Sequence, residues 1–406
     1  MTLTINYGDE LLTITLPPNA SIDEYAPRSA DGIVDAGQFD SALTDAEEGL
    51  FHFSETDLFV INDAYRATPT AKILLWLNQL GRLSDKARFL IATGCHPAPD
   101  ESQMRKIFGE FYILLKDRIA IHDADDWNAM AEADTDTTGE KVGLNRLFLE
   151  AERVVIIGSV EPHYFAGFTG GRKSIFPGLC DYETIVRNHN LAVDFSAAPM
   201  KLEGNPVEEH LQSLMRMIPD KKILAVQMVL GSGSDIRAVF CGGVEKAFES
   251  ATDFAEGTFG HRTDRKYDVV LAEVRPPLDS NLYQLQKSLE NCQSAAADEG
   301  TAILFSRCRE GIGSRQFYDL AGRWSPGDGA IPEGKGSFGR HKLYRVYKIG
   351  HRIHIHLYSE LAEGVPEKVF FKSARSPQRI IDNSAKNCEY MRVALVRDAG
   401  HTVLMS

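Results

Sequence analysis

The chain has 406 residues, of which 43% are hydrophobic and 25% charged, a composition typical of folded globular proteins and not of disordered or fibrous ones. This length exceeds what one compact core usually holds, so two domains are expected. The formal net charge of -13 is not offset by a basic stripe, which argues against nucleic acid as a partner. The start lacks the pattern of a secretory signal, and no apolar run is long enough to cross a bilayer, so we expect a cytoplasmic protein without membrane contact.

The six cysteines are scattered singly and form no Cys-x-x-Cys pair. This spacing excludes a zinc knuckle and argues against a disulfide framework. We therefore expect reduced, mostly buried thiols. Nothing in the composition predicts an oligomeric state.

The first half of the chain repeats a pattern of strand, polar turn and helix. Residues 2–16 alternate apolar and polar around a Tyr-Gly-Asp-Glu turn, which predicts an opening hairpin. Short apolar runs at 57–61, 87–92 and 153–158 predict buried strands, and apolar residues at helical spacing follow the first two. This rhythm is typical of an α/β fold with a largely parallel sheet, whose strand ends gather distant residues into one crevice.

Polar residues follow each of these predicted strands. Asp63 and Arg66 follow the first strand, and Thr93 and His96 follow the second. Residues at strand ends are often simple caps, so position alone is weak support for a functional role. We expect a site here because the three strand ends would meet at one edge of the sheet.

The segment after the third strand contains the largest number of candidate functional residues. A Gly-Gly turn at 170–171 allows backbone N–H groups to approach an anion, and Arg172 and Lys173 add positive charge. His163 lies before this turn and His189 after it. One loop system therefore contains groups for phosphate binding, covalent attachment, and proton transfer or metal ligation.

The remainder of the chain continues the α/β pattern. An acidic stretch at 123–140 lacks the ligand spacing of a calcium loop and is interpreted as a solvated loop. A polar, glycine-containing stretch at 257–266 predicts a boundary between an N-terminal cofactor-binding α/β domain, 1–262, and a C-terminal α/β domain, 263–406, that closes over the site. A basic, glycine-rich stretch at 325–340 predicts a mobile loop.

Two segments of the second domain carry polar groups. His354 and His356 alternate on a predicted strand, and a half-exposed strand face explains them better than a metal site, because no third ligand is evident nearby. At 278–288 a helix is predicted to begin beside the cleft, with Lys287 placed to bind an anion. An amphipathic surface helix is the alternative for this segment.

With these residues gathered, the chain resembles the nickel-dependent lactate racemase family of 2-hydroxyacid racemases and epimerases. The likeness is densest from Glu161 to Gly178, which is similar to the family's run ending in Ser/Thr-Gly-Gly-Arg-Lys and Pro-Gly. It continues through both domains in the family's order, at His189, 202–206, Tyr283, Gln284 and Lys287.

The resemblance implies a cofactor that neither composition nor spacing reveals. This is a nickel-pincer nucleotide, a pyridinium-3-thioamide-5-thiocarboxylic acid mononucleotide, attached covalently to Lys173 with His189 as the protein's nickel ligand. The enzymes that make and load this cofactor are the implied partners. The other implied cofactor-binding residues are Thr68, Gly170, Gly171 and Arg172.

The resemblance also implies roles for the substrate site. His96 and His163 would be the acid/base pair, and Arg66 and Lys287 would hold the substrate carboxylate. Asp63, Tyr283 and Gln284 complete the implied site.

The chain departs from the family pattern at several positions. Ala67 follows Arg66 where the family usually has proline, the arginine expected near His96 is missing, and a late tryptophan has no clear counterpart. These changes keep the groups that the chemistry needs and leave lactate itself open as the substrate.

The predicted activity is inversion of the C2 centre of a 2-hydroxyacid by hydride abstraction and return, as a racemase or an epimerase. One histidine on each side of the substrate could serve either enantiomer, because imidazole titrates near neutral pH. Two alternatives stay open: a pyridoxal-phosphate enzyme that uses Lys173 as its Schiff-base lysine, and a non-catalytic hydroxyacid- or cofactor-binding protein on the same fold.

Overall fold

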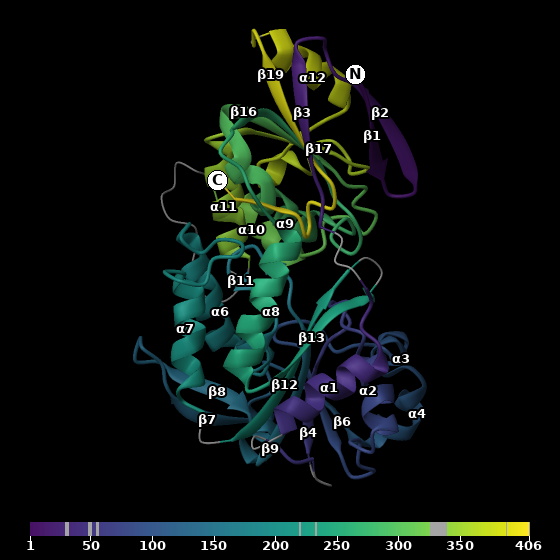
Figure 1. Ribbon diagram of the computed structural model, residues 1–406. Coiled ribbons are helices and arrows are strands. Elements are labelled where there is room, and N and C mark those ends of the chain that lie inside the picture. Colours follow the sequence, from purple (N-terminus) through teal and green to yellow (C-terminus); the bar gives the residue numbers. More distant parts are fainter. Residues whose placement is uncertain are drawn as a thin grey trace.

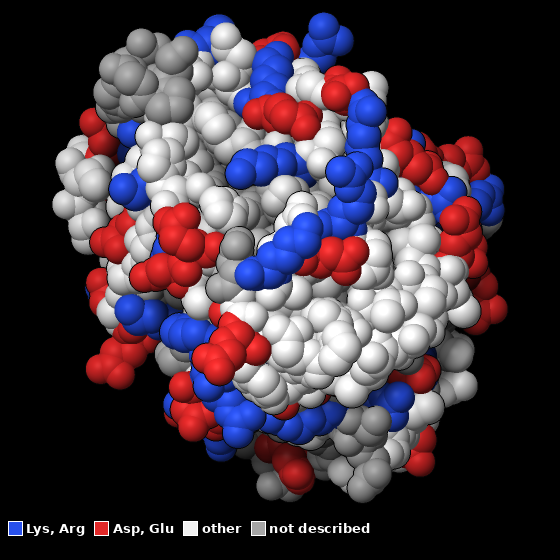
Figure 2. All heavy atoms as spheres, turned by 90° about the horizontal axis from the view of Figure 1, so that it is seen from above, with Lys and Arg blue, Asp and Glu red and all other residues white. Residues whose placement is uncertain are grey.

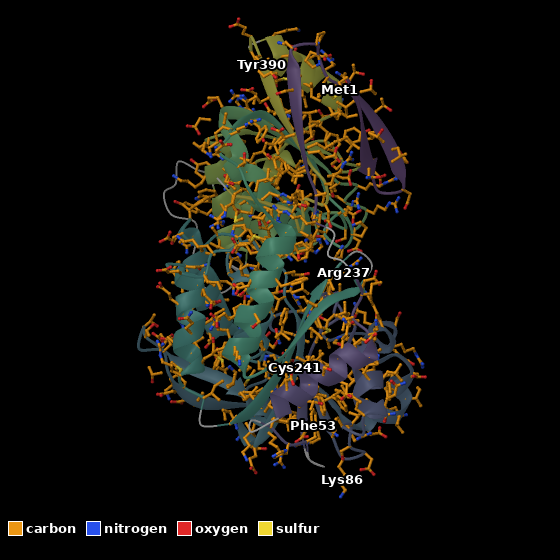
Figure 3. All side chains as sticks on the ribbon, viewed as in Figure 1. Met1, Phe53, Lys86, Arg237, Cys241 and Tyr390 are labelled. Carbon is orange, nitrogen blue, oxygen red and sulfur yellow. The ribbon has the colours of Figure 1, made fainter. Side chains whose placement is uncertain are left out.

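The computed structural model describes residues 1–28, 32–47, 51–53, 57–218, 221–231, 234–324, 339–386 and 388–405. Two α/β domains are stacked one above the other (Figure 1). Met1 and Tyr390 lie at the far end of the upper domain, whereas Phe53 and Lys86 lie at the opposite end of the molecule (Figure 3). The predicted fold class, two α/β domains with largely parallel sheets, is confirmed.

The lower domain is built on one six-stranded sheet. In spatial order its strands are β13 (Ile236–Gly242), β12 (Lys222–Leu230), β9 (Arg153–Ser159), β4 (Leu58–Asn62), β5 (Arg88–Ala92) and β6 (Ile119–Ile121). All neighbours pair in parallel except β12 and β13. The central strands are apolar runs buried on both faces, as expected where helices cover a parallel sheet.

Helices cover both faces of this sheet. They are α1 (Ala36–Glu47), α2 (Thr70–Gln79), α3 (Glu101–Phe108), α4 (Tyr112–Leu115), α5 (Arg146–Glu150), α6 (Tyr182–Asn190), α7 (Pro206–Met215) and α8 (Val244–Phe259), with short 3₁₀ turns between them. Alternate residues of each strand enter separate cores: Phe59 packs with Trp76 on one face, while Val60 packs with Phe176 on the other. The strand ends are therefore held rigidly from both sides.

The upper domain is built on a second six-stranded sheet whose strands are all parallel. Its order is β18 (Lys372–Ser373), β17 (His354–Tyr358), β16 (Ala296–Phe305), β15 (Tyr267–Glu273), β19 (Met391–Val396) and β3 (Ala20–Tyr25). Three helices, α9 (Leu282–Cys292), α10 (Arg315–Arg323) and α11 (Arg340–Gly350), contribute to the core on one face. The hairpin of β1 (Thr2–Tyr7) and β2 (Glu10–Thr15), with α12 (Pro377–Lys386), covers the other.

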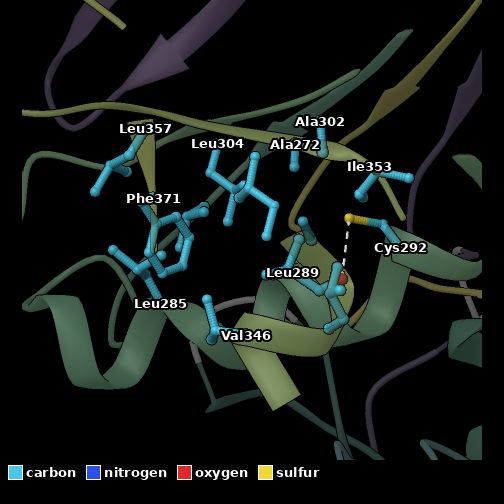
Figure 4. Close-up of a cluster of buried hydrophobic side chains, with 14 of the residues drawn as sticks. Ala272, Leu285, Leu289, Cys292, Ala302, Leu304, Val346, Ile353, Leu357 and Phe371 are labelled. Atoms are coloured by element: carbon cyan, nitrogen blue, oxygen red, sulfur yellow. Dashed lines mark hydrogen bonds between the residues drawn. The ribbon is translucent and has the colours of Figure 1, made fainter. Parts of the chain in front are cut away.

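The buried face of α9 anchors this helix in the upper core. Leu285 and Leu289 lie among Leu304, Leu357 and Phe371 in the close-up of Figure 4. Because residues three and four apart share a helix face, this packing turns Gln284 and Lys287 toward another surface. The core thus decides which side chains of α9 reach the space between the domains.

The opening segment, residues 2–25, belongs to the upper domain and not to the predicted N-terminal domain at 1–262. The hairpin at 2–16 forms as predicted, and β3 then pairs with β19, nearly the last strand of the chain. Conversely, β14 (Gly260–Arg262) pairs with β20 (Val403–Met405). Strand pairing between residues so far apart depends on tertiary packing, so local patterns did not predict it.

Most residues of the acidic stretch at 123–140 are exposed, as predicted, but the stretch is not a loop throughout, because it contains one strand and the turn of a hairpin. β7 (Met130–Thr135) pairs antiparallel with β8 (Lys141–Asn145). At the turn, the buried Asp136 carboxylate accepts hydrogen bonds from the Thr138 backbone N–H at 2.9 Å and from Arg187 Nε at 3.0 Å. These bonds offset the burial of the charge and hold the turn closed.

The remaining predictions concern the loop at 325–340, the histidines of the strand at 354–358, surface charge and membrane-spanning helices. Residues 325–338 of the loop predicted at 325–340 lie outside the described residues. His354 is exposed and His356 half-buried on β17, as a half-exposed strand face requires. On the face seen in Figure 2, basic side chains are interspersed with acidic ones. Among the described helices, none combines the length and the apolar character that crossing a membrane demands.

Candidate functional site

A cavity of about 1450 Å³ lies between the two domains and is lined by residues of both. It brings together side chains that follow β4, β5 and β9 of the lower sheet and side chains of α9 from the upper domain. The predicted site residues on its wall are Asp63, Arg66, His96, His163, Gly170, Lys173, His189, Tyr283, Gln284 and Lys287. Thr68, Gly171 and Arg172 are not among the lining residues.

His96 lies on the more open side of the cavity and is bonded to a carboxylate. Its Nδ1 is 2.6 Å from Asp63 Oδ2, and the other oxygen of Asp63 accepts the backbone N–H of Tyr65 at 3.1 Å. A carboxylate accepts only from a protonated nitrogen, so this bond places the proton on Nδ1. In the neutral ring, Nε2 is then unprotonated and can act as a base.

His163 also lines the cavity and is buried among aromatic rings. β10 (Pro162–His163) pairs with β11 (Gly167–Phe168), and the ring lies 5.0 Å from Tyr164 and 4.5 Å from Phe165 between centroids. Its Nδ1 faces the backbone N–H of Ala166 at 3.3 Å, so the neutral ring carries its proton on Nε2. Burial, with the nearby charges of Lys173 and Arg66, lowers the pKa of His163 well below its ordinary value.

Lys173 lies in the short 3₁₀ helix η4 (Gly171–Ser174), after the chain has turned back from β11. Its Nζ is 5.6 Å from the ring centroid of Phe165. Burial and the charges of Arg66 and Lys287 lower the pKa of Lys173 to about 7, although Glu208 opposes them. Much of the amine is therefore neutral at physiological pH, the form in which lysine is a nucleophile.

His189 lies in the last turn of α6 and contacts Phe165 and His341, with ring centroids 5.0 and 5.7 Å away. Burial and the charge of Lys173 lower the pKa of His189 to about 3, so the imidazole is neutral. Its buried Nδ1 has no hydrogen-bond partner among the described residues. A neutral imidazole with an unsatisfied nitrogen is suited to binding a metal ion.

The upper domain contributes α9 to the cavity. Asn281 caps this helix by accepting the backbone N–H of Gln284 at 3.0 Å. Burial and the charge of Arg66 lower the pKa of Lys287 to about 8, so Lys287 stays largely protonated at neutral pH. Lys287 and Arg66 thus form a cationic pair with one member from each domain.

Two of the predicted cofactor-binding residues, Gly171 and Thr68, make contacts within the protein. Gly171 N–H donates to Gln227 Oε1 at 2.7 Å, and a Cβ on Gly171 would lie 2.6 Å from the Phe248 side chain. This glycine therefore permits close packing against α8, and its N–H is already paired. Thr68 Oγ1 likewise lies 2.9 Å from Ser159 Oγ.

Arg172 also points away from the cavity. Its Nη1 donates to Glu245 Oε2 at 2.6 Å, and its Nη2 contacts Glu208. The buried guanidinium lies 5.0 Å from the centroid of the Phe248 ring. Arg172 thus ties η4 to α7 and α8 through its two acidic partners and supports the position of Lys173 indirectly.

Sequence models of two lactate racemase domains match the chain, the N-terminal domain at residues 7–200 and the C-terminal domain at residues 263–325. The chain belongs to the lactate racemase family. Lactate racemase of Thermoanaerobacterium thermosaccharolyticum is 30% identical over 289 residues, which are 70% of this chain and 65% of that protein. Lactate racemase of Lactiplantibacillus plantarum is 27% identical over 280 residues, 68% of this chain and 65% of that protein. The chain thus spans just under two thirds of the length of these curated relatives.

Solved structures support the same family fold. The lactate racemase apoprotein from Thermoanaerobacterium thermosaccharolyticum has a TM-score of 0.85 and 22% identity, with 100% of both chains covered. A protein from Thermotoga maritima has a TM-score of 0.69 and 15% identity, with 93% of this chain and 100% of the other covered. At these identities the likeness shows the fold alone.

Lys173 and His189, predicted as the cofactor attachment site and the nickel ligand, both line the cavity. Lys173 offers a partly neutral amine, and His189 offers a buried nitrogen without a partner. Within the described ranges, no three His, Cys, Asp or Glu side chains are clustered closely enough to hold a metal ion. A nickel ion at His189 would therefore need further donors from the cofactor, such as the sulfur atoms of a pincer nucleotide.

Several residues on the cavity wall were not predicted as site residues. Glu161, His401 and Lys342 all line it. Lys342 donates to Tyr283 O at 3.0 Å and lies 4.5 Å from the Tyr164 ring centroid. Glu161 begins the stretch 161–178 that resembles the family, so the sequence could have indicated it. Lys342 and His401 lie near no motif, and only the tertiary structure brings them to the cavity.

Proposed function

We propose that this member of the lactate racemase family is an isomerase, a racemase or epimerase that inverts C2 of a 2-hydroxyacid and carries a nickel-pincer nucleotide attached to Lys173. One observation carries the proposal: a partly neutral lysine, a histidine with an unpartnered buried nitrogen, and two further histidines line a single cavity. The bound cofactor would supply the hydride acceptor and donor at C2.

Binding and orientation of the substrate would come from both domains. Arg66 of the lower domain and Lys287 of the upper domain form a cationic pair that suits a carboxylate. Holding the carboxylate at two points lets the planar ketoacid present either face of C2 without leaving the site. Tyr283 and Gln284 lie on the same wall and would shape the pocket around the rest of the substrate.

Proton transfer would be divided between the two histidines. Asp63 holds His96 with its proton on Nδ1, so Nε2 can remove the proton of the substrate hydroxyl. His163 can return a proton to the carbonyl oxygen from Nε2 when it has first taken up a second proton on Nδ1, at the cost of the contact with Ala166 N–H, and the ring is neutral after the transfer. The proton that His96 has taken then returns to solvent, and the reverse reaction exchanges the roles of the two histidines.

The proposal is tested by intact mass and metal content of protein co-expressed with the enzymes that make the cofactor. We expect a covalent mass increment that maps to Lys173, stoichiometric nickel, and turnover of at least one 2-hydroxyacid. Lys173→Ala should abolish the increment, whereas the exposed Lys201→Ala should retain it. Unmodified mass under conditions that load another family member would contradict the proposal and favour a binding protein. An absorbance band of an internal aldimine would instead favour pyridoxal phosphate.

A further inference from the structure

A row of charged groups crosses from one domain to the other beside Arg66. Arg66 Nη1 donates to Glu161 Oε1 at 3.4 Å, and Glu161 Oε2 lies 3.5 Å from His401 Nε2. His401 Nδ1 lies 3.0 Å from Asp398 Oδ2. Arg66 and Glu161 follow strands of the lower sheet, whereas Asp398 and His401 lie between β19 and β20. All four line the cavity, so the row forms part of its wall.

The backbone holds both central members of this row in place. Glu161 N–H donates to Thr169 Oγ1 at 3.0 Å, and Glu161 O accepts from Thr169 N at 2.8 Å. Asp398 adopts a φ of +45°, in the left-handed region that side chains other than glycine rarely occupy. Its carbonyl accepts the backbone N–H of His401 at 2.9 Å.

Charge complementarity supports the same connection. Burial would raise the pKa of Glu161, but the hydrogen bond and charge of His401, with Arg66 and Lys287, lower it to about 2. Burial would lower the pKa of His401, but Asp398 and Glu161 raise it well above its ordinary value. Glu161 is therefore an anion between two cations, one from each domain.

We propose that His401 is a positioning residue for substrate binding, which acts through Glu161 on Arg66. This inference rests on the proposed function, in which Arg66 binds the substrate carboxylate. His401 occupies one oxygen of Glu161 and leaves the other for a single hydrogen bond from Arg66. Without His401, the Glu161 carboxylate can turn and pair with Arg66 through both oxygens, and it then competes with the substrate for the guanidinium.

The row also connects substrate binding to the arrangement of the domains. Because His401 comes from the upper domain, Glu161 is held in this way only when that domain lies against the lower one. Arg66 is then available to a carboxylate where Lys287 is also in place. Through His401, Arg66 of the lower domain becomes available to the substrate carboxylate in the same domain arrangement that places Lys287 of the upper domain beside it.

The test is a kinetic double-mutant cycle on the cofactor-loaded protein with Glu161→Gln and His401→Ala. We expect His401→Ala to raise KM about tenfold, the size of one hydrogen bond to a charged group, with kcat within about threefold of wild type. In the Glu161→Gln background the same change should alter KM by less than about twofold, because the group through which His401 acts is gone. Additive losses, or a lower kcat at unchanged KM, would overturn the inference.

Two further variants guard against a general loss of structure. His401→Gln keeps a hydrogen-bond donor toward Glu161 and should recover most of the affinity. His354→Gln, at an exposed position on β17, should change neither parameter. If His401→Gln behaves like His401→Ala while both retain the wild-type thermal unfolding midpoint, a donor at this position is not what matters and the inference fails.

Calorimetric titration with sodium lactate separates this inference from the proposed function. If the loaded wild-type protein binds lactate but turns over no hydroxyacid, the proposed reaction fails. The positioning role is then decided by the affinities, which should be about tenfold weaker for His401→Ala. Equal lactate affinities of the wild-type protein and His401→Ala would overturn the positioning role. It would also be overturned if the wild-type protein bound no substrate in the kinetic assay and no lactate in the calorimetric titration.

Discussion

The two histidines proposed as the acid/base pair, His96 and His163, lie in opposite environments. The side chain of His96 is 41% exposed and bonded to the Asp63 carboxylate, whereas His163 is 8% exposed and surrounded by aromatic rings. On one side a carboxylate sets the tautomer, and on the other a backbone N–H does so. In the neutral rings the unprotonated nitrogen is Nε2 of His96 but Nδ1 of His163, and in the proposed reaction this difference would separate the base from the proton donor, because the environment and not the residue type sets the role.

Removing either imidazole should have the largest effect. Because each histidine handles a proton in the reaction, His96→Gln and His163→Gln should each lower kcat by roughly 10²- to 10⁴-fold. The covalent adduct at Lys173 should persist in both, as measured by intact mass. The exposed His351→Gln serves as the matched control. Full activity in either cavity variant would refute the acid/base assignment.

The two sides should also differ in what their aromatic neighbours contribute to stability. Phe165 is buried beside His163, so Phe165→Ala should lower the free energy of unfolding by about 3–5 kcal/mol. Tyr65 lies 4.7 Å from the His96 ring centroid but is 45% exposed, and Tyr65→Ala should cost less than about 1 kcal/mol. Chemical denaturation measures both. Similar losses would show that the two sides are equally packed and would remove this contrast.

Asp63→Asn removes the carboxylate partner of His96 and leaves the surroundings of His163 unchanged. The amide can accept a hydrogen bond but carries no charge to stabilise the imidazolium form of His96, so kcat should fall about a hundredfold. The structure should stay intact, since the change keeps the side-chain shape. An exposed counterpart, Asp298→Asn, should leave kcat unchanged. Wild-type kcat in Asp63→Asn would mean that His96 needs no carboxylate partner.

The buried side also predicts how Lys173 responds to pH. Its lowered pKa means that the reactive neutral amine increases as pH rises through about 7, and below that value the protonated form prevails. Acetylation by an amine-specific ester, followed by peptide mass, should give a midpoint near 7 for Lys173. Arg66→Met removes a charge that lowers this pKa and should move the midpoint upward. A Lys173 midpoint at the ordinary lysine value of 10.5 would show that Lys173 is not desolvated.

Much of the fold and of the site could be predicted from local patterns. Buried apolar runs at 57–61, 87–92 and 153–158 correspond to β4, β5 and β9, because a strand covered on both faces needs such a run. Their parallel order explains why Asp63, His96 and His163 share one cavity.

Other features depend on partners that local patterns do not reveal. The Gly-Gly-Arg turn looked like an anion site, but Gln227 accepts the Gly171 N–H, and Glu208 with Glu245 pairs with Arg172. A local motif shows which hydrogen-bond donors are present, but the acceptors that pair with them come from residues distant in the sequence.

By itself, the sequence determined the main strands of the lower sheet and most of the predicted site residues that line the cavity, because periodicity and motif spacing are local properties. Only the tertiary structure decided that β3 joins the upper sheet, that His96 and His163 carry their protons on different nitrogens, and that His401 reaches Glu161. The physical reason is that burial, charge and hydrogen bonding at these positions come from residues distant in the chain.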